Sequence, residues 1–128
     1  MKLSVLAAVG SGGALGASLR WAVGECGERF FPGLYSFTLI LINLTGCIAI
    51  GFLTELLIFW HPSPWLKSFL ITGFLGGFTT FSAFAVEFAL LSEHYGILYA
   101  GGYALVSVAA SLLGFYAGSG FGRLILMP

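Results

Sequence analysis

Four long apolar blocks dominate this sequence, and each is long enough to cross a lipid bilayer as a helix. They cover residues 3–24, 37–60, 65–91 and 97–127, with boundaries approximate to a few residues. A transmembrane helix needs roughly 20 residues to cross about 30 Å of hydrocarbon, and it satisfies its backbone N–H and C=O groups within the segment. No stretch alternates with period two, as the strands of a membrane barrel do. We therefore expect an all-α integral membrane protein with four transmembrane helices.

The composition supports a chain that lies almost entirely in the membrane. Of its residues, 59% are hydrophobic and 8% are charged, whereas a soluble domain carries about 25% charged residues. The connections, residues 25–36, 61–64 and 93–96, are short. We expect one four-helix transmembrane domain over residues 1–128, with no soluble domain and no linker.

The third block contains an unusual run of glycine, threonine and phenylalanine at residues 73–84. The paired glycines Gly76 and Gly77 cost about 2 kcal/mol of helix propensity relative to alanine, and Thr79 and Thr80 follow at once. We expect this helix to be broken from about Gly76 to Thr80, although an ordinary glycine kink is the alternative. Broken helices in membranes expose carbonyl groups that can hold a small cation.

The basic residues are divided almost evenly between the two membrane faces. Four spans put both termini on one side, so Lys2, Lys67 and Arg123 lie at one face, and Arg20 and Arg29 at the other. The positive-inside rule needs a clear excess of Lys and Arg on one side. Either a short protein has few charges by chance, or the chain inserts both ways round and pairs antiparallel.

Two spans carry ladders of small residues, which let helix backbones approach closely in lipid. The ladders consist of Gly10, Gly12, Gly13, Gly16 and Ala17 in the first span, and of Ala110, Gly114, Gly118 and Gly122 in the fourth. The packing lies within one subunit or between two, and two glycine-lined faces favour oligomerisation.

Polar side chains inside the second and fourth spans are candidates for a transport path. Asn43 either bonds a neighbouring helix or donates its NH₂ group to an anion. Tyr103, Ser107 and Ser111 are spaced by four residues and therefore share one helical stripe. Their hydroxyls either bond helix carbonyls or line a polar track.

Two phenylalanines and a glutamate follow the expected break on one helical face. Phe81 and Phe84 either pack against neighbours or turn the positive edges of their rings toward an anion. Glu87 is one turn further on, and a carboxylate in a span is a functional candidate by default. Glu55 and Arg20 lie near span ends, where they can reach headgroups.

The sequence holds no recognisable catalytic set, so we expect a protein that is not an enzyme. Ser-His-Asp, HExxH and phosphate-loop patterns are absent, and the two histidines flank turns. The spacing of Cys26 and Cys47 matches neither a metal site nor a disulfide framework.

Three segments together resemble the Fluc (CrcB) family of fluoride channels. The most specific is residues 73–84, which is very close to the signature of that family's third span. Residues 12–21 and 43–47 support it in order. The resemblance covers essentially the whole chain.

The resemblance implies a multi-pass protein of the cell inner membrane that exports fluoride passively. Members of this family are antiparallel homodimers of dual topology, with two fluoride pores along the subunit interface. A central structural sodium ion is held by backbone carbonyls, which correspond to those of Gly76 and Thr79 in this sequence.

The resemblance also assigns individual residues to the pores. Arg20 and Glu87 correspond to a pore mouth, and the fluoride pore would be lined by Asn43, Phe81, Phe84, Ser82, Tyr103, Ser107 and Ser111. The sequence departs from the family pattern in one place. A threonine usually stands four residues before the pore asparagine, where this chain has Leu39, and Thr38 is one position off.

A small multidrug transporter of dual topology is the alternative function, since it also has four spans and about this length. Such a transporter is expected to carry a glutamate within its first span to bind protons and cationic drugs. The first span here has no acidic residue between Leu3 and Gly24.

Overall fold

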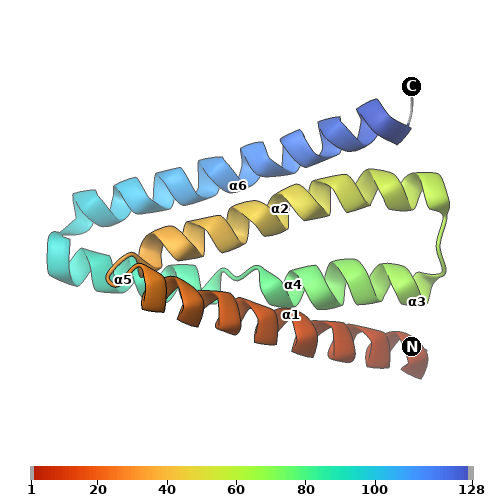
Figure 1. The fold of residues 1–128 in the computed structure, drawn as a ribbon, viewed down its shortest axis with the longest axis horizontal. Helices are drawn as coiled ribbons and strands as arrows, with labels where there is room; N and C mark the ends of the chain where they lie inside the picture. Colours follow the sequence, from red (N-terminus) through yellow and green to blue (C-terminus); the bar gives the residue numbers. More distant parts are fainter. Residues whose placement is uncertain (1, 127–128) are drawn as a thin grey trace.

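The computed structural model describes residues 2–126 and confirms an all-helical chain with four long apolar helices. Helix α1 covers Leu3–Phe30, α2 covers Tyr35–Trp60 and α6 covers Ile97–Leu126. The third long helix, Pro64–Tyr95, is interrupted within its length. Each of the four has the length and hydropathy needed to cross a membrane. Both ends of the described chain lie at the same end of the bundle, as an even number of spans requires (Figure 1).

Some helices extend beyond the predicted spans. Helix α1 continues to Phe30 rather than ending near residue 24, and the third long helix continues to Tyr95 rather than ending near residue 91. The predicted end of the fourth span, at residue 127, lies outside the described residues. The connections are correspondingly tight. His61 adopts φ 51° at the end of α2, and Gly96, at φ 89°, allows the sharp turn into α6.

The third long helix is built from four pieces. A short helix, α3 (Pro64–Lys67), leads into a π-helix, η1 (Ser68–Leu75), and then into α4 (Gly76–Phe78). An irregular stretch at residues 79–81 follows, and α5 (Ser82–Tyr95) completes the helix. Figure 1 shows this stretch as a coil between α4 and α5, well inside the bundle. Thr79 is extended there, with φ −78° and ψ 152°.

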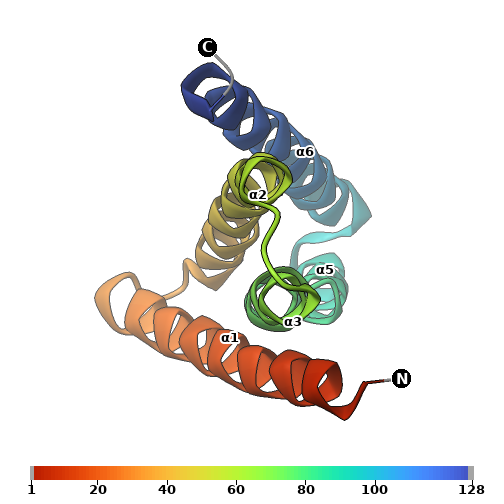
Figure 2. The same cartoon turned by 90° about the vertical axis from the view of Figure 1, so that its right-hand side faces the viewer.

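The helices pack as two close pairs, α1 with η1 and α4, and α2 with α6. Seen along the bundle, α1 and α6 lie on opposite sides of α2 and the third long helix (Figure 2). In the first pair, a Cβ added at Gly12 or Gly16 would overlap backbone atoms of Phe69 or Phe74. These glycines therefore let the backbone of α1 rest directly on that of η1.

The second pair relies on glycines in the same way. A Cβ added at Gly114 would meet the Leu44 side chain, and one added at Gly118 or Gly122 would meet atoms of Ile48, Phe52 or Glu55. Most glycines of both ladders are thus used by contacts within the chain, whereas a Cβ added at Gly10 would meet no atom of residues 2–126 within 4 Å. The ladders explain how the subunit packs, and the oligomerisation expected from the sequence stays a prediction.

This packing predicts different effects for two alanine substitutions in α6. A Cβ at Gly118 would lie 2.9 Å from the carbonyl carbon of Ile48 and 3.0 Å from the amide nitrogen of Phe52. Gly118→Ala should therefore lower the stability of the purified protein by about 1–3 kcal/mol, the usual cost of overpacking. At Gly120, no atom of residues 2–126 lies within 4 Å of an added Cβ.

Gly120→Ala is the matched control, and it should leave stability unchanged or raise it by up to about 1 kcal/mol through helix propensity. Thermal unfolding in detergent measures both variants. Equal unfolding midpoints for the two would contradict this account of the α2–α6 contact.

Candidate functional site

The interruption of the third long helix is held by the side chain of Asn43 on α2. Its Oδ1 accepts a hydrogen bond from the Thr80 N–H at 2.9 Å, and its Nδ2 donates to the Thr80 carbonyl at 3.2 Å. One amide side chain thus satisfies both backbone polar groups of one residue outside the regular helix. A backbone group left without a partner at this depth would cost several kcal/mol.

The break lies slightly later in the chain than the sequence predicts. Gly76 and Gly77 keep helical geometry in α4, and the irregular residues are 79–81 rather than 76–80. Gly77 instead allows a close approach, because a Cβ there would lie 3.0 Å from the Cα of Gly13 in α1. The partner of Thr80 sets the position of the break, and that partner is 37 residues away in sequence.

The two backbone carbonyls that are candidates for cation binding receive no hydrogen bond within the described part of the chain. The Gly77 carbonyl accepts a bond from Arg20 Nε at 3.2 Å, and the Thr80 carbonyl accepts from Asn43. The carbonyls of Gly76 and Thr79 receive no such bond from residues 2–126. They are the two carbonyls that the family resemblance implies as cation ligands, and they have free lone pairs for one.

The described chain has no cluster of side chains of the kind that binds a transition metal. Among residues 2–126, no group of three His, Cys, Asp or Glu side chains comes together. Carbonyl oxygens are hard ligands that suit hard cations such as Na⁺. The donor set at the break therefore fits an alkali cation held by backbone and does not resemble a transition-metal site.

A groove of about 460 Å³ opens beside the break between α2, the third long helix and α6. Its lining comprises Asn43, Cys47, Gly76, Thr79, Thr80, Phe81, Phe84, Ser107, Val108, Ser111 and Leu112. It thus brings together five of the seven predicted pore residues, from three helices, with the two predicted cation ligands.

The two phenylalanines of the groove form part of a ring stack. The ring centroids of Phe81 and Phe84 are 5.1 Å apart with the planes tilted by 36°, and Phe84 stacks on Tyr103 at 5.4 Å. Phe81 is 75% exposed in the single subunit. Its ring is therefore accessible from the groove. Tilted rings of this kind can turn a positive edge toward an anion.

Two predicted pore residues lie outside this lining. Tyr103 lies on a second groove, together with Ser36, and its hydroxyl has no hydrogen-bond partner among the described residues although the side chain is only 7% exposed. Ser82 is exposed and shares a hydrogen bond of 3.1 Å with the Thr80 hydroxyl. The predicted stripe of three hydroxyls on α6 is therefore split between two grooves.

The two residues predicted at a pore mouth have separate partners. Glu87 is buried and accepts a short hydrogen bond from Ser36 Oγ, whereas Arg20 is half-buried against the Gly77 carbonyl. No hydrogen bond or ion pair joins Arg20 to Glu87 within residues 2–126. Arg20 therefore binds the backbone just before the break and does not extend toward a lipid headgroup.

Neither candidate at the departure from the family pattern reaches the groove. Leu39 is 1% exposed in the core. The Thr38 hydroxyl donates to the Leu34 carbonyl at 3.3 Å, and its side chain faces Gly27 of α1. The groove thus has no hydroxyl from this turn of α2.

Two contacts at the ends of helices were not predicted from the sequence, namely the Thr80 cap and the contact of Glu55 with Ser119 and Arg123. The Thr80 hydroxyl accepts a bond of 3.3 Å from the Ala83 N–H and so caps α5. Glu55 is 5% exposed and bonds Ser119 Oγ at 2.6 Å and Arg123 Nε at 3.0 Å, so it pins α2 to α6 and does not reach a headgroup. Ser119 and Arg123 are four residues apart on α6, and this spacing was the sequence signal for a shared polar partner.

The chain is similar over most of its length to one protein family. Residues 7–119 match the model described as "CrcB-like protein, Camphor Resistance (CrcB)". The relative from Paracoccus denitrificans is 45% identical over 115 residues, which cover 90% of this chain and 91% of that protein. The relative from Rhodospirillum centenum is 38% identical over 117 residues, which cover 91% and 93%.

A more distant relative extends the match almost to both ends of the chain. The protein from Clostridium novyi is 34% identical, with 97% of this chain and 98% of that protein covered. All three relatives carry the name "Fluoride-specific ion channel FluC".

Proposed function

The chain belongs to the CrcB family, and on that basis we propose that it forms a fluoride-specific ion channel. The proposed activity is passive fluoride export across the membrane, down the electrochemical gradient of the ion. The observation that carries the proposal is the groove beside the break, where the Asn43 amide, the Phe81 and Phe84 rings and two α6 serines share one wall. A channel moves an ion without chemical conversion, so no catalytic set is needed.

The chemistry of this wall suits a small, strongly hydrated anion. Taking fluoride from water into a low-dielectric span is costly unless other donors replace its water. The hydroxyls of Ser107 and Ser111 and the second hydrogen of the Asn43 amide are such donors, and the ring edges are a weaker kind. None carries a fixed positive charge, so each binds weakly enough for the ion to leave, as conduction requires.

We further propose that the functional unit is an antiparallel homodimer with two pores along its interface. The groove of one subunit is open and far larger than an ion, since a water molecule occupies about 30 Å³. A second copy would cover Phe81 and narrow the groove. No other chain is required for this, because an antiparallel copy presents the same surface.

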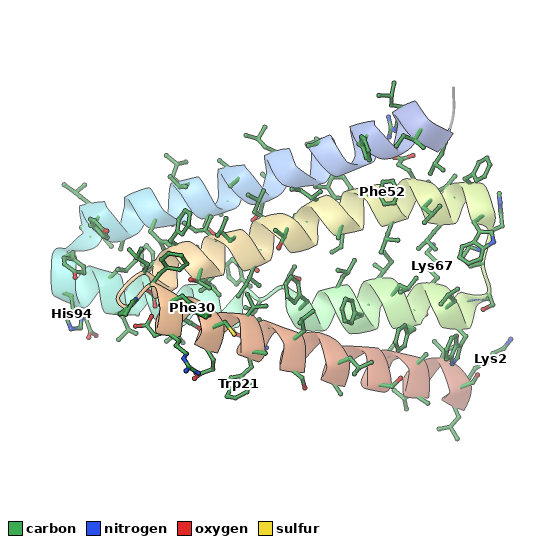
Figure 3. The ribbon with its side chains drawn as sticks, viewed as in Figure 1. Lys2, Trp21, Phe30, Phe52, Lys67 and His94 are labelled. Carbon is green, nitrogen blue, oxygen red and sulfur yellow. The ribbon has the colours of Figure 1, made fainter. Side chains whose placement is uncertain are left out.

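The charge distribution favours antiparallel pairing. Lys2 and Lys67 lie at one end of the bundle, and Phe30 and His94 mark the other (Figure 3). Arg123 is at the basic end, where it pairs with Glu55. The opposite end carries Arg20 and Arg29, but it also has most of the carboxylates, with Glu25, Glu28 and Glu93 in or beside its connections, so it is the more acidic end. Antiparallel subunits would set each basic end beside an acidic one.

The centre of the proposed dimer would hold a structural sodium ion. The free carbonyls of Gly76 and Thr79 support this assignment, because two subunits would supply them in duplicate. When bound, the ion supplies positive potential near the groove. A multidrug transporter is less well supported, since α1 carries no acidic residue before Glu25 and so lacks the expected proton site.

The direct test is ion flux from liposomes that contain the purified protein. Fluoride should leave passively on addition of a potassium ionophore, and chloride should be rejected strongly. A fluoride electrode and a chloride electrode record the two fluxes. A saturable, proton-coupled flux of cationic drugs without a fluoride current would favour the multidrug transporter instead.

The orientation of the chain in the membrane tests the proposed assembly. Because three basic residues face one side and two the other, the protein should insert in both orientations in similar amounts. Labelling of a tag at one terminus in sealed vesicles, before and after permeabilisation, measures the two fractions. A single orientation would exclude an antiparallel dimer made from this chain alone.

Replacing the groove phenylalanines separates a packing role from a transport role. Phe81→Ile and Phe84→Ile conserve apolar volume, and such swaps usually cost less than about 1.5 kcal/mol of stability. If the ring edges contact fluoride, both variants should assemble normally and lose most of their fluoride flux. Phe59→Ile is the control, because Phe59 is also exposed but does not line the groove. Wild-type flux in both groove variants would show that the rings only pack.

A further inference from the structure

Two backbone N–H groups at the break are diverted from their normal helical acceptors. In a regular α-helix each N–H donates to the carbonyl four residues earlier, so Thr80 would donate to Gly76, and Ala83 to Thr79. In the structure, the Thr80 N–H donates instead to Asn43 Oδ1 at 2.9 Å. The Ala83 N–H donates to the Thr80 hydroxyl at 3.3 Å.

Each diversion frees one carbonyl, and the two freed carbonyls are those of Gly76 and Thr79. The correspondence is one to one: the Asn43 amide accounts for Gly76, and the Thr80 hydroxyl accounts for Thr79. The carbonyls of Gly77 and Thr80 are not free, because Arg20 donates to the first and Asn43 to the second. Two side chains thus hold the N–H groups that would otherwise occupy the carbonyls of Gly76 and Thr79.

We propose that Asn43 and Thr80 are the positioning residues of the sodium site. This inference rests on the sodium ion of the proposed function and adds the cause of its site. Neither side chain is assigned a contact with the ion. Asn43 keeps the Gly76 carbonyl open, and the Thr80 hydroxyl keeps the Thr79 carbonyl open.

The same two residues line the groove proposed for the anion. The second hydrogen of the Asn43 amide points to no partner within residues 2–126, so it remains available to an anion while Oδ1 holds the Thr80 N–H. Cation site and anion path thus share a single amide group. Loss of that amide should therefore affect both sodium binding and fluoride flux.

A purely structural role makes a different prediction. Thr80 is half-buried and caps α5, and a lost helix cap lowers stability by about 0.5–2 kcal/mol whichever cation is present. If the residue positions the sodium site, its loss instead weakens the rise of the unfolding midpoint with sodium concentration. The two roles are separated by measuring stability as a function of sodium concentration.

The test uses thermal unfolding of the full-length protein in detergent. Sodium is varied at constant ionic strength, with N-methylglucamine as the replacement cation. A ligand that binds the folded state raises the unfolding midpoint with concentration, so the wild-type midpoint should rise with sodium. Fluoride flux from liposomes is recorded in parallel for every variant.

The critical variant is Thr80→Val, which keeps the shape and the backbone N–H but removes the hydroxyl acceptor. The Ala83 N–H can then return to the Thr79 carbonyl, so the variant should need about 10–100 times more sodium for the same shift, as is typical when an outer-shell partner is lost. Thr80→Ser keeps the hydroxyl and should respond as the wild type does. Asn43→Leu tests the Gly76 carbonyl by the same logic and should also lose flux.

The outcomes are distinct. If Thr80→Val folds and keeps the wild-type sodium response, the proposed positioning role is wrong, whereas the proposed sodium site remains supported. A midpoint lowered equally at all sodium concentrations also overturns it in favour of the capping role. If the wild type conducts fluoride but shows no sodium response, the sodium site and this inference both fail, and the channel remains. If Asn43→Leu does not fold, the comparison of Thr80→Val with Thr80→Ser still tests the positioning role.

Discussion

The amide of Asn43 is the interaction on which the site depends. A membrane span cannot leave backbone groups without partners, so a helix can be interrupted only where something replaces its hydrogen bonds. Asn43 replaces both bonds of Thr80, and Arg20 and the Thr80 hydroxyl serve the neighbouring groups. These bonds stabilise the break, and they leave the carbonyls of Gly76 and Thr79 without a donor among residues 2–126.

The surrounding packing makes these long-range bonds possible. Backbone contact between α1 and η1, through Gly12 and Gly16, brings Arg20 alongside α4. Backbone contact between α2 and α6, through Gly118, fixes the wall that carries the α6 serines. The buried Glu55 adds a polar tie at the basic end of this second pair. Small residues thus set the distances between the packed helices, and a few polar side chains fix how the helices are aligned along their length.

Sequence reasoning gave the four helices, the interruption and most of the groove, because hydropathy, glycine pairs and i, i+4 spacing are local signals. It started the break three residues too early and ended it one residue too early, since the partner of Thr80 is on another helix. Spacing places Tyr103 on one stripe with two serines, but in the folded chain Tyr103 lines a second groove while the serines line the first. Likewise Glu55 is buried because Ser119 and Arg123 meet it from α6.

The π-helix η1 has a consequence for how the rest of the third span is oriented. A π-helix closes its bonds over five residues rather than four, so the eight residues of η1 complete fewer turns than an α-helix of the same length. The angular phase of every later residue is shifted accordingly, and the break shifts it again. A helical wheel drawn continuously from Pro64 therefore does not give the directions of Phe81 and Phe84. The winding of the backbone through η1 and the break contributes, together with the Asn43 contact, to which residues of α5 face the groove.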